Sequence, residues 1–235
     1  MKSLAITASF LSLWLTGTAC AVERFGELPE RFWAETDLRY WRATYLPGVS
    51  PIASDEGRWI ATLTLGWRRF FWSAPFNLTP EPWLTQPAYP NQRMQLFGDA
   101  FSLGYLVHPY LAITLGERYA GERFGGGIEP PRTNYTTLSA RMDWPLEDSK
   151  LALRGAVTAG YGRTLHSHSG RVHTSLEMGV TYPLIEATRI QLGYKAEWLE
   201  LAHPLNTGGT WHATGPWGEG QSRQSGAYTG IVLSF

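Results

Sequence analysis

The chain ends on the stretch Gly226-Ala227-Tyr228-Thr229-Gly230-Ile231-Val232-Leu233-Ser234-Phe235. Apolar Ile231, Leu233 and Phe235 alternate in it with Gly230, Val232 and Ser234. Successive side chains of a strand point to opposite faces, so this strand has one apolar face and one small or mixed face. That pattern fits a wall that meets lipid on one side. The terminal stretch therefore predicts a membrane-facing β-strand.

The same residues also resemble a known C-terminal sequence pattern. A glycine shortly before the end, Gly230, followed by Leu233-Ser234-Phe235 at the terminus, resembles the C-terminal assembly signal of Gram-negative outer-membrane β-barrel proteins. In that family the terminal strand is what the insertion machinery engages. The resemblance implies a location in the cell outer membrane, among its lipids and lipopolysaccharide. It also implies the barrel-assembly machinery as a partner, through the strand that ends at Phe235.

The other end of the chain has the layout of an export signal. Met1-Lys2 is followed by a largely apolar run from Leu4 to Leu15 and by Ala19-Cys20-Ala21. A basic start, a short apolar core and an Ala-x-Ala exit predict a secretory signal peptide over residues 1–21. Lipoprotein processing at Cys20 is the alternative, although Gly17 stands where such signals have leucine. After cleavage behind Ala21 the chain would contain no cysteine.

Composition narrows the class of protein. Twenty basic and twenty acidic residues give no net charge, which argues against a nucleic-acid partner. No later stretch offers the roughly 18 apolar residues of a membrane helix. An exported membrane protein of this kind must then be a closed barrel, because only helices and barrels satisfy every backbone group in lipid. Eleven Trp, eleven Tyr and ten Phe suit the aromatic girdles of a barrel, or the surface of a sugar-binding sandwich.

Alternation predicts an all-β fold, a transmembrane antiparallel up-and-down β-barrel of eight strands over residues 58–235. The first strand, from Arg58, alternates an apolar row from Trp59 to Trp67 with a polar row. A loop from Ser73 to Asn91 follows, where five prolines oppose a central strand. The other seven predicted strands are Gln92–Val107, Leu111–Phe124, Tyr135–Leu146, Leu151–Thr164, Arg171–Leu184, Arg189–His203 and the terminal stretch.

Residues 22–57 are predicted to be a periplasmic lead-in or to hold an additional strand. Asp37 to Leu46 is a possible strand in that segment. If it pairs with another early strand, the barrel has ten strands, which is the alternative to eight. Connections that alternate between short and long favour the even-numbered barrels of the outer membrane, where the short turns are periplasmic.

The inward rows of the predicted strands carry charges of both signs. A narrow barrel is just wide enough for side chains to fill it, and buried charges must be paired. We therefore expect one neutralising cluster that leaves no path for solutes. Its predicted members, from four strands consecutive in the chain, are Arg141, Asp143, Arg154, Glu177, Lys195 and Glu197.

One set of inward residues has the chemistry of an acyl hydrolase. His173, Ser175 and Glu177 supply a base, a nucleophile and an orienting carboxylate on one strand. Lipid A deacylase barrels are similar in architecture and carry His-x-Ser-Asn on the penultimate strand. Here that place has His203-Pro204-Leu205-Asn206, with leucine instead of the nucleophile. We therefore assign no catalytic residue and keep the three as an alternative.

No metal or cofactor is expected. His166, His168 and His173 are close in sequence, but no acidic residue or cysteine of the tip completes a site. Trp211, His212, Trp217 and Tyr89 on predicted outer loops can stack on a sugar or contact an extracellular ligand of unknown identity.

The function expected is that of a small, non-enzymatic outer-membrane barrel, which acts through its extracellular loops or supports the envelope. A narrow solute channel is the alternative. Ten or more strands with a lumen of one charge sign would favour it. A lipid A-modifying acyl hydrolase is the second alternative.

Overall fold

The computed structural model describes residues 28–47, 52–53, 57–79, 84–86, 89–124, 133–164, 167–185, 187–200 and 221–235. The predicted signal peptide, residues 1–21, lies outside them. No helix in these ranges is long and apolar enough to cross a membrane. The strands are β1 (Phe32–Trp41), β2 (Thr44–Pro47), β3 (Ile52–Ala53), β4 (Arg58–Trp67), β5 (Phe70–Asn77), β6 (Leu84–Gln86), β7 (Tyr89–His108), β8 (Leu111–Phe124), β9 (Thr133–Pro145), β10 (Ala152–Thr164), β11 (Ser167–Ile185), β12 (Thr188–Glu200) and β13 (Gln221–Ser234).

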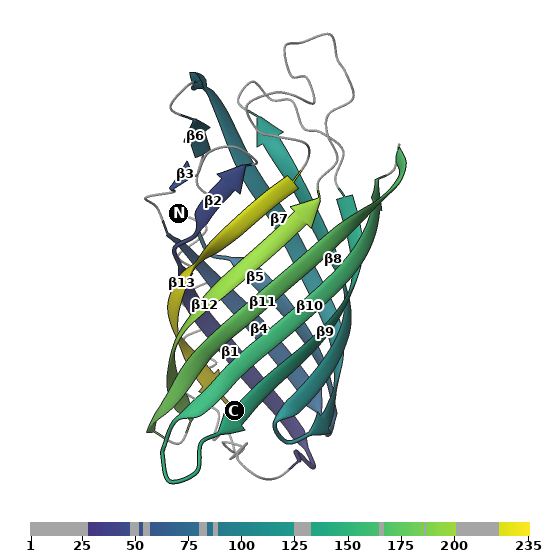
Figure 1. The fold of residues 1–235 in the computed structure, drawn as a ribbon. Helices are drawn as coiled ribbons and strands as arrows, with labels where there is room; N and C mark the ends of the chain where they lie inside the picture. Colours follow the sequence, from purple (N-terminus) through teal and green to yellow (C-terminus); the bar gives the residue numbers. More distant parts are fainter. Residues whose placement is uncertain are drawn as a thin grey trace, which may run out of the picture.

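Ten of these strands form a closed antiparallel wall in the order β1, β4, β5, β7 to β13 (Figure 1). The wall closes where β1 pairs with β13, from Glu35 opposite Ser234 to Trp41 opposite Tyr228. The terminal Phe235 takes part in the closure: its N–H donates to the Ala34 carbonyl at 2.8 Å and its carbonyl accepts from the Ala34 N–H at 3.0 Å. β2, β3 and β6 are short additions at one end.

The eight-strand prediction is wrong, because the wall contains ten strands, the number given as the alternative. The two further strands are β1 and β5. β1 begins five residues before the possible strand Asp37–Leu46. β2 then continues along β13 in the same register. β5 begins before the proline-rich stretch Ser73–Asn91, which is predicted as a loop, and runs into it as far as Asn77.

Pro75 is tolerated in β5 because of where its missing N–H would point. β5 pairs with β4 along its whole length but with β7 only over Phe70–Ser73. The Leu106 N–H donates to the Arg69 carbonyl at 2.8 Å, so odd-numbered residues of β5 present their backbone groups to β7. Pro75 therefore removes no hydrogen bond to β4, and its N–H is missing on an edge that β7 leaves unpaired.

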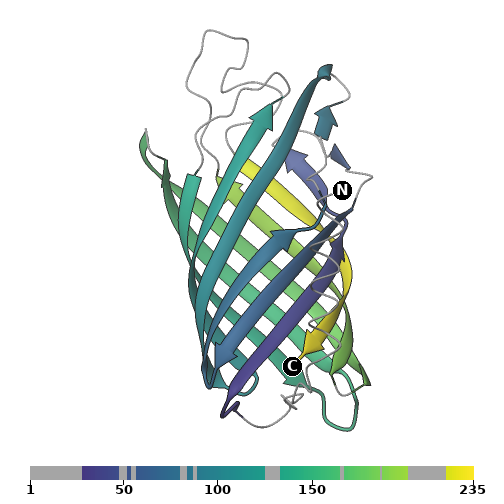
Figure 2. The same ribbon diagram turned by 180° about the vertical axis from the view of Figure 1, so that it is seen from behind.

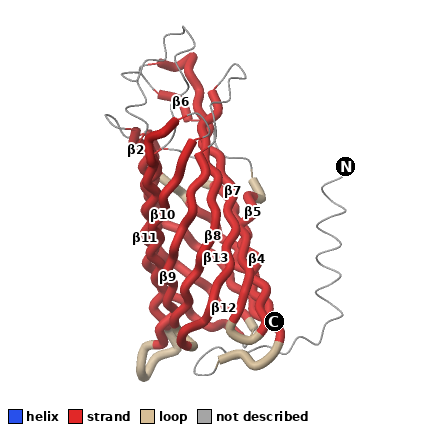
Figure 3. The backbone as a smooth tube through the Cα atoms, turned by 90° about the vertical axis from the view of Figure 1, so that its right-hand side faces the viewer, coloured by secondary structure: helices blue, strands red, loops and turns tan. Residues whose placement is uncertain are grey.

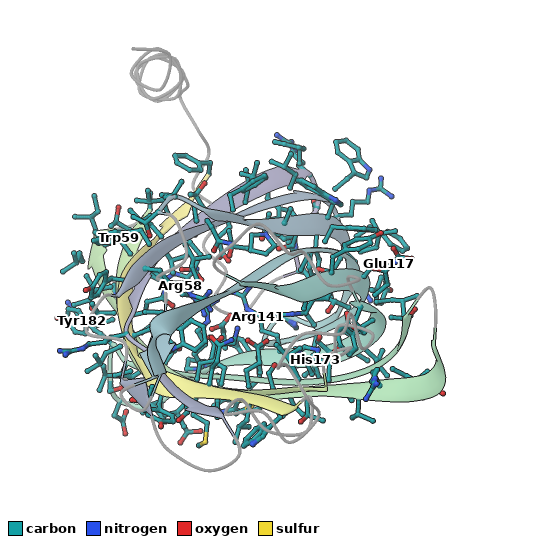
Figure 4. The ribbon with its side chains drawn as sticks, turned by 90° about the horizontal axis from the view of Figure 1, so that it is seen from above. Arg58, Trp59, Glu117, Arg141, His173 and Tyr182 are labelled. Atoms are coloured by element: carbon teal, nitrogen blue, oxygen red, sulfur yellow. The ribbon has the colours of Figure 1, made fainter. Side chains whose placement is uncertain are left out.

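Side chains alternate between lipid and lumen all around the wall. Leu103 and Leu192 are 64% and 59% exposed on the outside, whereas Val232 is fully buried inside. Viewed along the barrel in Figure 4, Trp59 and Tyr182 lie outside, while Arg141 and His173 lie inside. Exposed aromatic residues continue the outer rows near the short turns; they include Phe32, Trp67, Phe70 and Trp144. The outer surface is thus an apolar belt with aromatic residues at its margin.

The two ends of the barrel differ. Connections β4–β5, β7–β8, β9–β10 and β11–β12 are two to six residues long, and they share their end with the C-terminus (Figures 1 and 3). The opposite end carries most of the longer connections. In barrels of this type the short-turn end is periplasmic. We call the half near the short turns the periplasmic half and the other the outer half.

Candidate functional site

β1 supplies the centre of the lumen network. Its inward row contains Glu35, Asp37 and Arg39, and the two carboxylates are 1% and 3% exposed. Their outward neighbours are Ala34, Thr36 and Leu38, which make a weak apolar row. This strand is not among those predicted from the sequence to contribute to the lumen cluster. The alternating charges at every second residue were the signal that could have revealed it.

Asp37 holds groups from three strands. It accepts hydrogen bonds from Arg39 at 2.5 Å and from the Arg154 guanidinium at 3.0 Å. The Gln191 amide also donates to it. Arg154 in turn donates to the Gln191 side-chain oxygen at 2.9 Å. The buried carboxylate is therefore compensated by two guanidinium groups and an amide, as burial of a charge requires.

Glu35 carries the network across the lumen. Its carboxylate accepts from Arg141 on β9 at 3.0 Å and from Arg189 on β12 at 2.8 Å. In the order of strands, β9 is the fifth strand from β1, which is diametrically opposite in a wall of ten. The Glu35–Arg141 pair therefore spans the interior. Arg141 also contacts Asp143 at 3.3 Å.

Glu177 joins the network at its upper edge. It accepts from Arg39 at 2.8 Å and from the Tyr228 hydroxyl at 3.1 Å. The Arg154 Nε lies 3.6 Å away. We call this connected set the periplasmic-half plug, and its members are Glu35, Asp37, Arg39, Arg141, Asp143, Arg154, Glu177, Arg189 and Gln191.

A second cluster lies nearer the outer end, around the buried Glu197. Its carboxylate contacts Arg118 on β8 at 2.7 Å, His173 Nε2 at 3.0 Å and Lys195 at 4.0 Å. The His173 ring packs beside Tyr135, with 5.7 Å between ring centroids. Arg118 and Glu197 come from strands four positions apart, so this contact also reaches across the lumen.

The predicted six-residue cluster is brought together only in part. Arg141, Asp143, Arg154 and Glu177 lie in the plug, with Arg154 Nε 3.8 Å from Asp143. Lys195 and Glu197 lie in the second cluster. The strand that ties the plug together was not predicted, because the partners of β1 are far away in sequence: 117 residues separate Asp37 from Arg154.

His173, Ser175 and Glu177 all face the lumen, but the structure does not assemble them as a triad. His173 pairs with Glu197 and Glu177 pairs with Arg39. Ser175 lies opposite Glu197 and Thr158 in the ladders. Within the described part of the chain, Ser175 makes no hydrogen bond to His173.

Nothing in the described ranges forms a group of three or more His, Cys, Asp or Glu residues that could hold a metal. His166, Trp211, His212 and Trp217 lie outside the described residues, and the side chains of His168 and Tyr89 are not described either.

Above the plug the outer half of the lumen contains a cavity of about 250 Å³. Its charged lining consists of Arg39, Arg58, Arg118, Lys195 and Glu177. The Arg58 guanidinium stands over the Trp41 ring at 4.4 Å, and the Lys195 ammonium is 5.1 Å from the same ring. We call this space the outer chamber.

A closed wall, an apolar exterior and a polar, charged interior define a transmembrane β-barrel of the outer-membrane type. The protein is located in the outer membrane, as the terminal strand predicted.

Comparison with known proteins found several barrels of this class among solved structures. Neisserial surface protein A is 12% identical, with 87% of this chain and 97% of that chain covered and a TM-score of 0.33. The outer-membrane protease OmpT of Escherichia coli is 10% identical, with 88% and 97% covered and a TM-score of 0.46. The translocator domain of autotransporter NalP from Neisseria meningitidis is 11% identical, with 100% and 98% covered and a TM-score of 0.39.

No protein-family model matches the chain, and no curated protein sequence does. Similarities of this size carry no information about what the barrel does.

Proposed function

We propose that the protein is a non-enzymatic outer-membrane barrel whose lumen is closed by the periplasmic-half plug, and which acts on the outer side of the membrane. The observation that carries the proposal is the Glu35–Arg141 pair, with 3.0 Å between its charged atoms, which bridges opposite walls. The outer half of the barrel and its outer connections are then available for binding, while the plug in the periplasmic half stabilises the wall.

The plug bears on whether a barrel of ten strands is a solute channel. A wall of ten strands is wider than one of eight, which alone would favour a channel. The lumen is not of one sign, however, and β1 adds Glu35 and Asp37 to the middle of it. Both carboxylates are almost fully buried, and each is held by groups from the far strands. This mixed, paired filling supports a closed barrel over a solute channel.

The surroundings of the barrel follow from its class. The outer rows contact outer-membrane lipid. The assembly machinery is proposed to engage the strand that ends at Phe235, in line with the backbone pairing of Phe235 to Ala34.

Single-channel recording in planar bilayers tests the closed lumen. Wild-type protein is expected to show no steady conductance, whereas the double variant Glu35→Ala/Arg141→Ala removes the bridging pair and should open a conducting path. A matched control, Glu147→Ala/Lys150→Ala, removes one acid and one base from an exposed turn and should stay silent. Both variants need a heat-dependent shift in gel mobility to show that they are folded.

Two outcomes would overturn the proposal. Steady conductance of the wild type would make the protein a channel. Release of acyl chains from lipid A by the purified protein, lost in a folded Ser175→Ala variant, would make it a hydrolase.

A further inference from the structure

The outer chamber reaches from the plug to the level at which three strands of the wall end. Glu177, at the upper edge of the plug, is at its floor. The lining also includes Trp41, Arg58 and Asn77, which are the last residue of β1, the first of β4 and the last of β5. In Figure 2, β5 stops part-way up the wall while β7 rises beyond it. The chamber therefore lies on the outer side of the plug, close to the outer rim of these strands.

One wall of the chamber is uncharged. It is formed by inward side chains of β4, β5 and β7, namely Ile60, Thr62, Pro75, Asn77 and Ala100. Three of these five side chains are apolar, in a lumen whose other inward rows are rich in charge. Binding sites for small molecules combine apolar walls with a few polar groups that fix the orientation of the ligand. This wall is therefore suited to the apolar body of a ligand.

Lys195 stands on the opposite side of the chamber. It belongs to β12, the fifth strand from β7 in the wall of ten, so Lys195 and Ala100 face each other across the lumen. The Lys195 ammonium is 4.0 Å from Glu197 and 5.1 Å from the Trp41 ring centroid. Neither contact is a hydrogen bond, and within the described part of the chain the ammonium has no acceptor. A cation that is only 24% exposed is stabilised by an acceptor beside it.

Arg118 supplies a second unpaired donor. One of its terminal nitrogens contacts Glu197 at 2.7 Å, but its buried Nε has no hydrogen-bond partner in the described ranges. Arg118 and Lys195 contact the same Glu197 oxygen, so the two cations lie close together. Glu197 itself is not part of the chamber lining, and Glu177, which is, already accepts from Arg39 and Tyr228. A guanidinium N–H and an ammonium side by side are suited to a carboxylate from outside the chain.

We propose that the outer chamber binds a small organic acid, a carboxylate with an apolar body. The carboxylate accepts from Lys195 and Arg118, and the body packs on the uncharged wall. The volume of about 250 Å³ limits the ligand to a small molecule. The inference rests on the proposed function, because it takes the plug as the floor of the chamber. The two can fail separately, because conductance reports on the plug and ligand binding reports on the chamber.

Fluorine NMR with para-fluorobenzoate tests the proposal on the mature protein in detergent micelles. The probe is expected to bind saturably at one site, and unlabelled benzoate should displace it. Para-fluorobenzyl alcohol has the same ring without the charge and should not compete. Acetate has the charge without the ring and should compete only at much higher concentration. Acetate as effective as benzoate would overturn the assignment, because the uncharged wall would then contribute nothing.

Two variants approach the chamber from opposite walls. Lys195→Met removes the ammonium and should weaken binding by about tenfold or more. Ala100→Leu fills the chamber from β7 and should weaken binding without changing any charge. Lys150→Met, in an exposed turn, is the matched control and should bind like the wild type. A heat-dependent shift in gel mobility shows that each variant is folded. Unchanged affinity in both folded chamber variants, or no saturable binding by the wild type, would overturn the proposal, whatever the conductance shows.

Discussion

Replacing Asp37 by Asn removes one charge from the centre of the plug with almost no change in shape. The carboxylate is 3% exposed and accepts hydrogen bonds from Arg39, Arg154 and Gln191. It accepts four hydrogen bonds in all, two of them from Arg39, and each bond to a charged group is worth about 1.5–3 kcal/mol. The two guanidinium groups keep other partners, however, since Arg39 still contacts Glu177 and Arg154 still contacts Gln191.

The expected loss is therefore that of one broken buried ion pair, about 3–5 kcal/mol in the free energy of unfolding. Urea titration in lipid vesicles, followed by tryptophan fluorescence, measures it. The matched control is Asp148→Asn, which makes the same substitution in an exposed turn and should change stability by less than about 0.5 kcal/mol.

A double-mutant cycle identifies the partner. Arg154→Gln combined with Asp37→Asn should lose less than the sum of the single losses, with a coupling of about 1–3 kcal/mol. An Asp37→Asn variant as stable as the Asp148→Asn control would refute the reasoning, because it would show that Asp37 is not an energetically important centre of the lumen.

Two further outcomes follow from the backbone. Deleting Phe235 removes the last backbone pair of the barrel seam and should sharply reduce the heat-shiftable protein in outer-membrane fractions; an unchanged yield would contradict this role. Gly193→Ala would place a Cβ 2.6 Å from the Met178 carbonyl oxygen and should lower the free energy of unfolding by about 1–3 kcal/mol. Gly155→Ala meets only a flexible methionine side chain at 3.1 Å, so equal losses in the two variants would refute the steric argument.

Much of the wall could be predicted from the sequence, because lipid imposes a strict alternation on each strand. The terminal stretch, for example, turns Ile231 outward and Val232 inward as expected. β1 was not predicted as a strand of the wall, because its outward row includes Ala34 and Thr36, which are hardly more apolar than an inward row. β5 was not predicted because Pro75 argues against a strand. The proline is compatible with β5 only because its missing N–H would face the side that β7 leaves unpaired, and the sequence does not reveal this.

The candidate site was harder to predict for a different reason. Alternation places Arg141, Arg154 and Glu177 inside, but it cannot say which charges meet across the lumen. That depends on the number of strands and on which wall stands opposite. With β1 missing, Glu35 and Asp37 were absent from the predicted cluster, although they hold its arginines.

The ion pairs of the periplasmic-half plug also bear on how the barrel folds. The plug joins residues that are 154 apart in the chain in the case of Glu35 and Arg189. Contacts of such sequence separation form late and make folding slow. Interactions that are absent from the transition state act mainly on the unfolding rate. The ion pairs of the lumen would then have little effect on the folding rate, but they would slow unfolding and so give the assembled barrel a long lifetime.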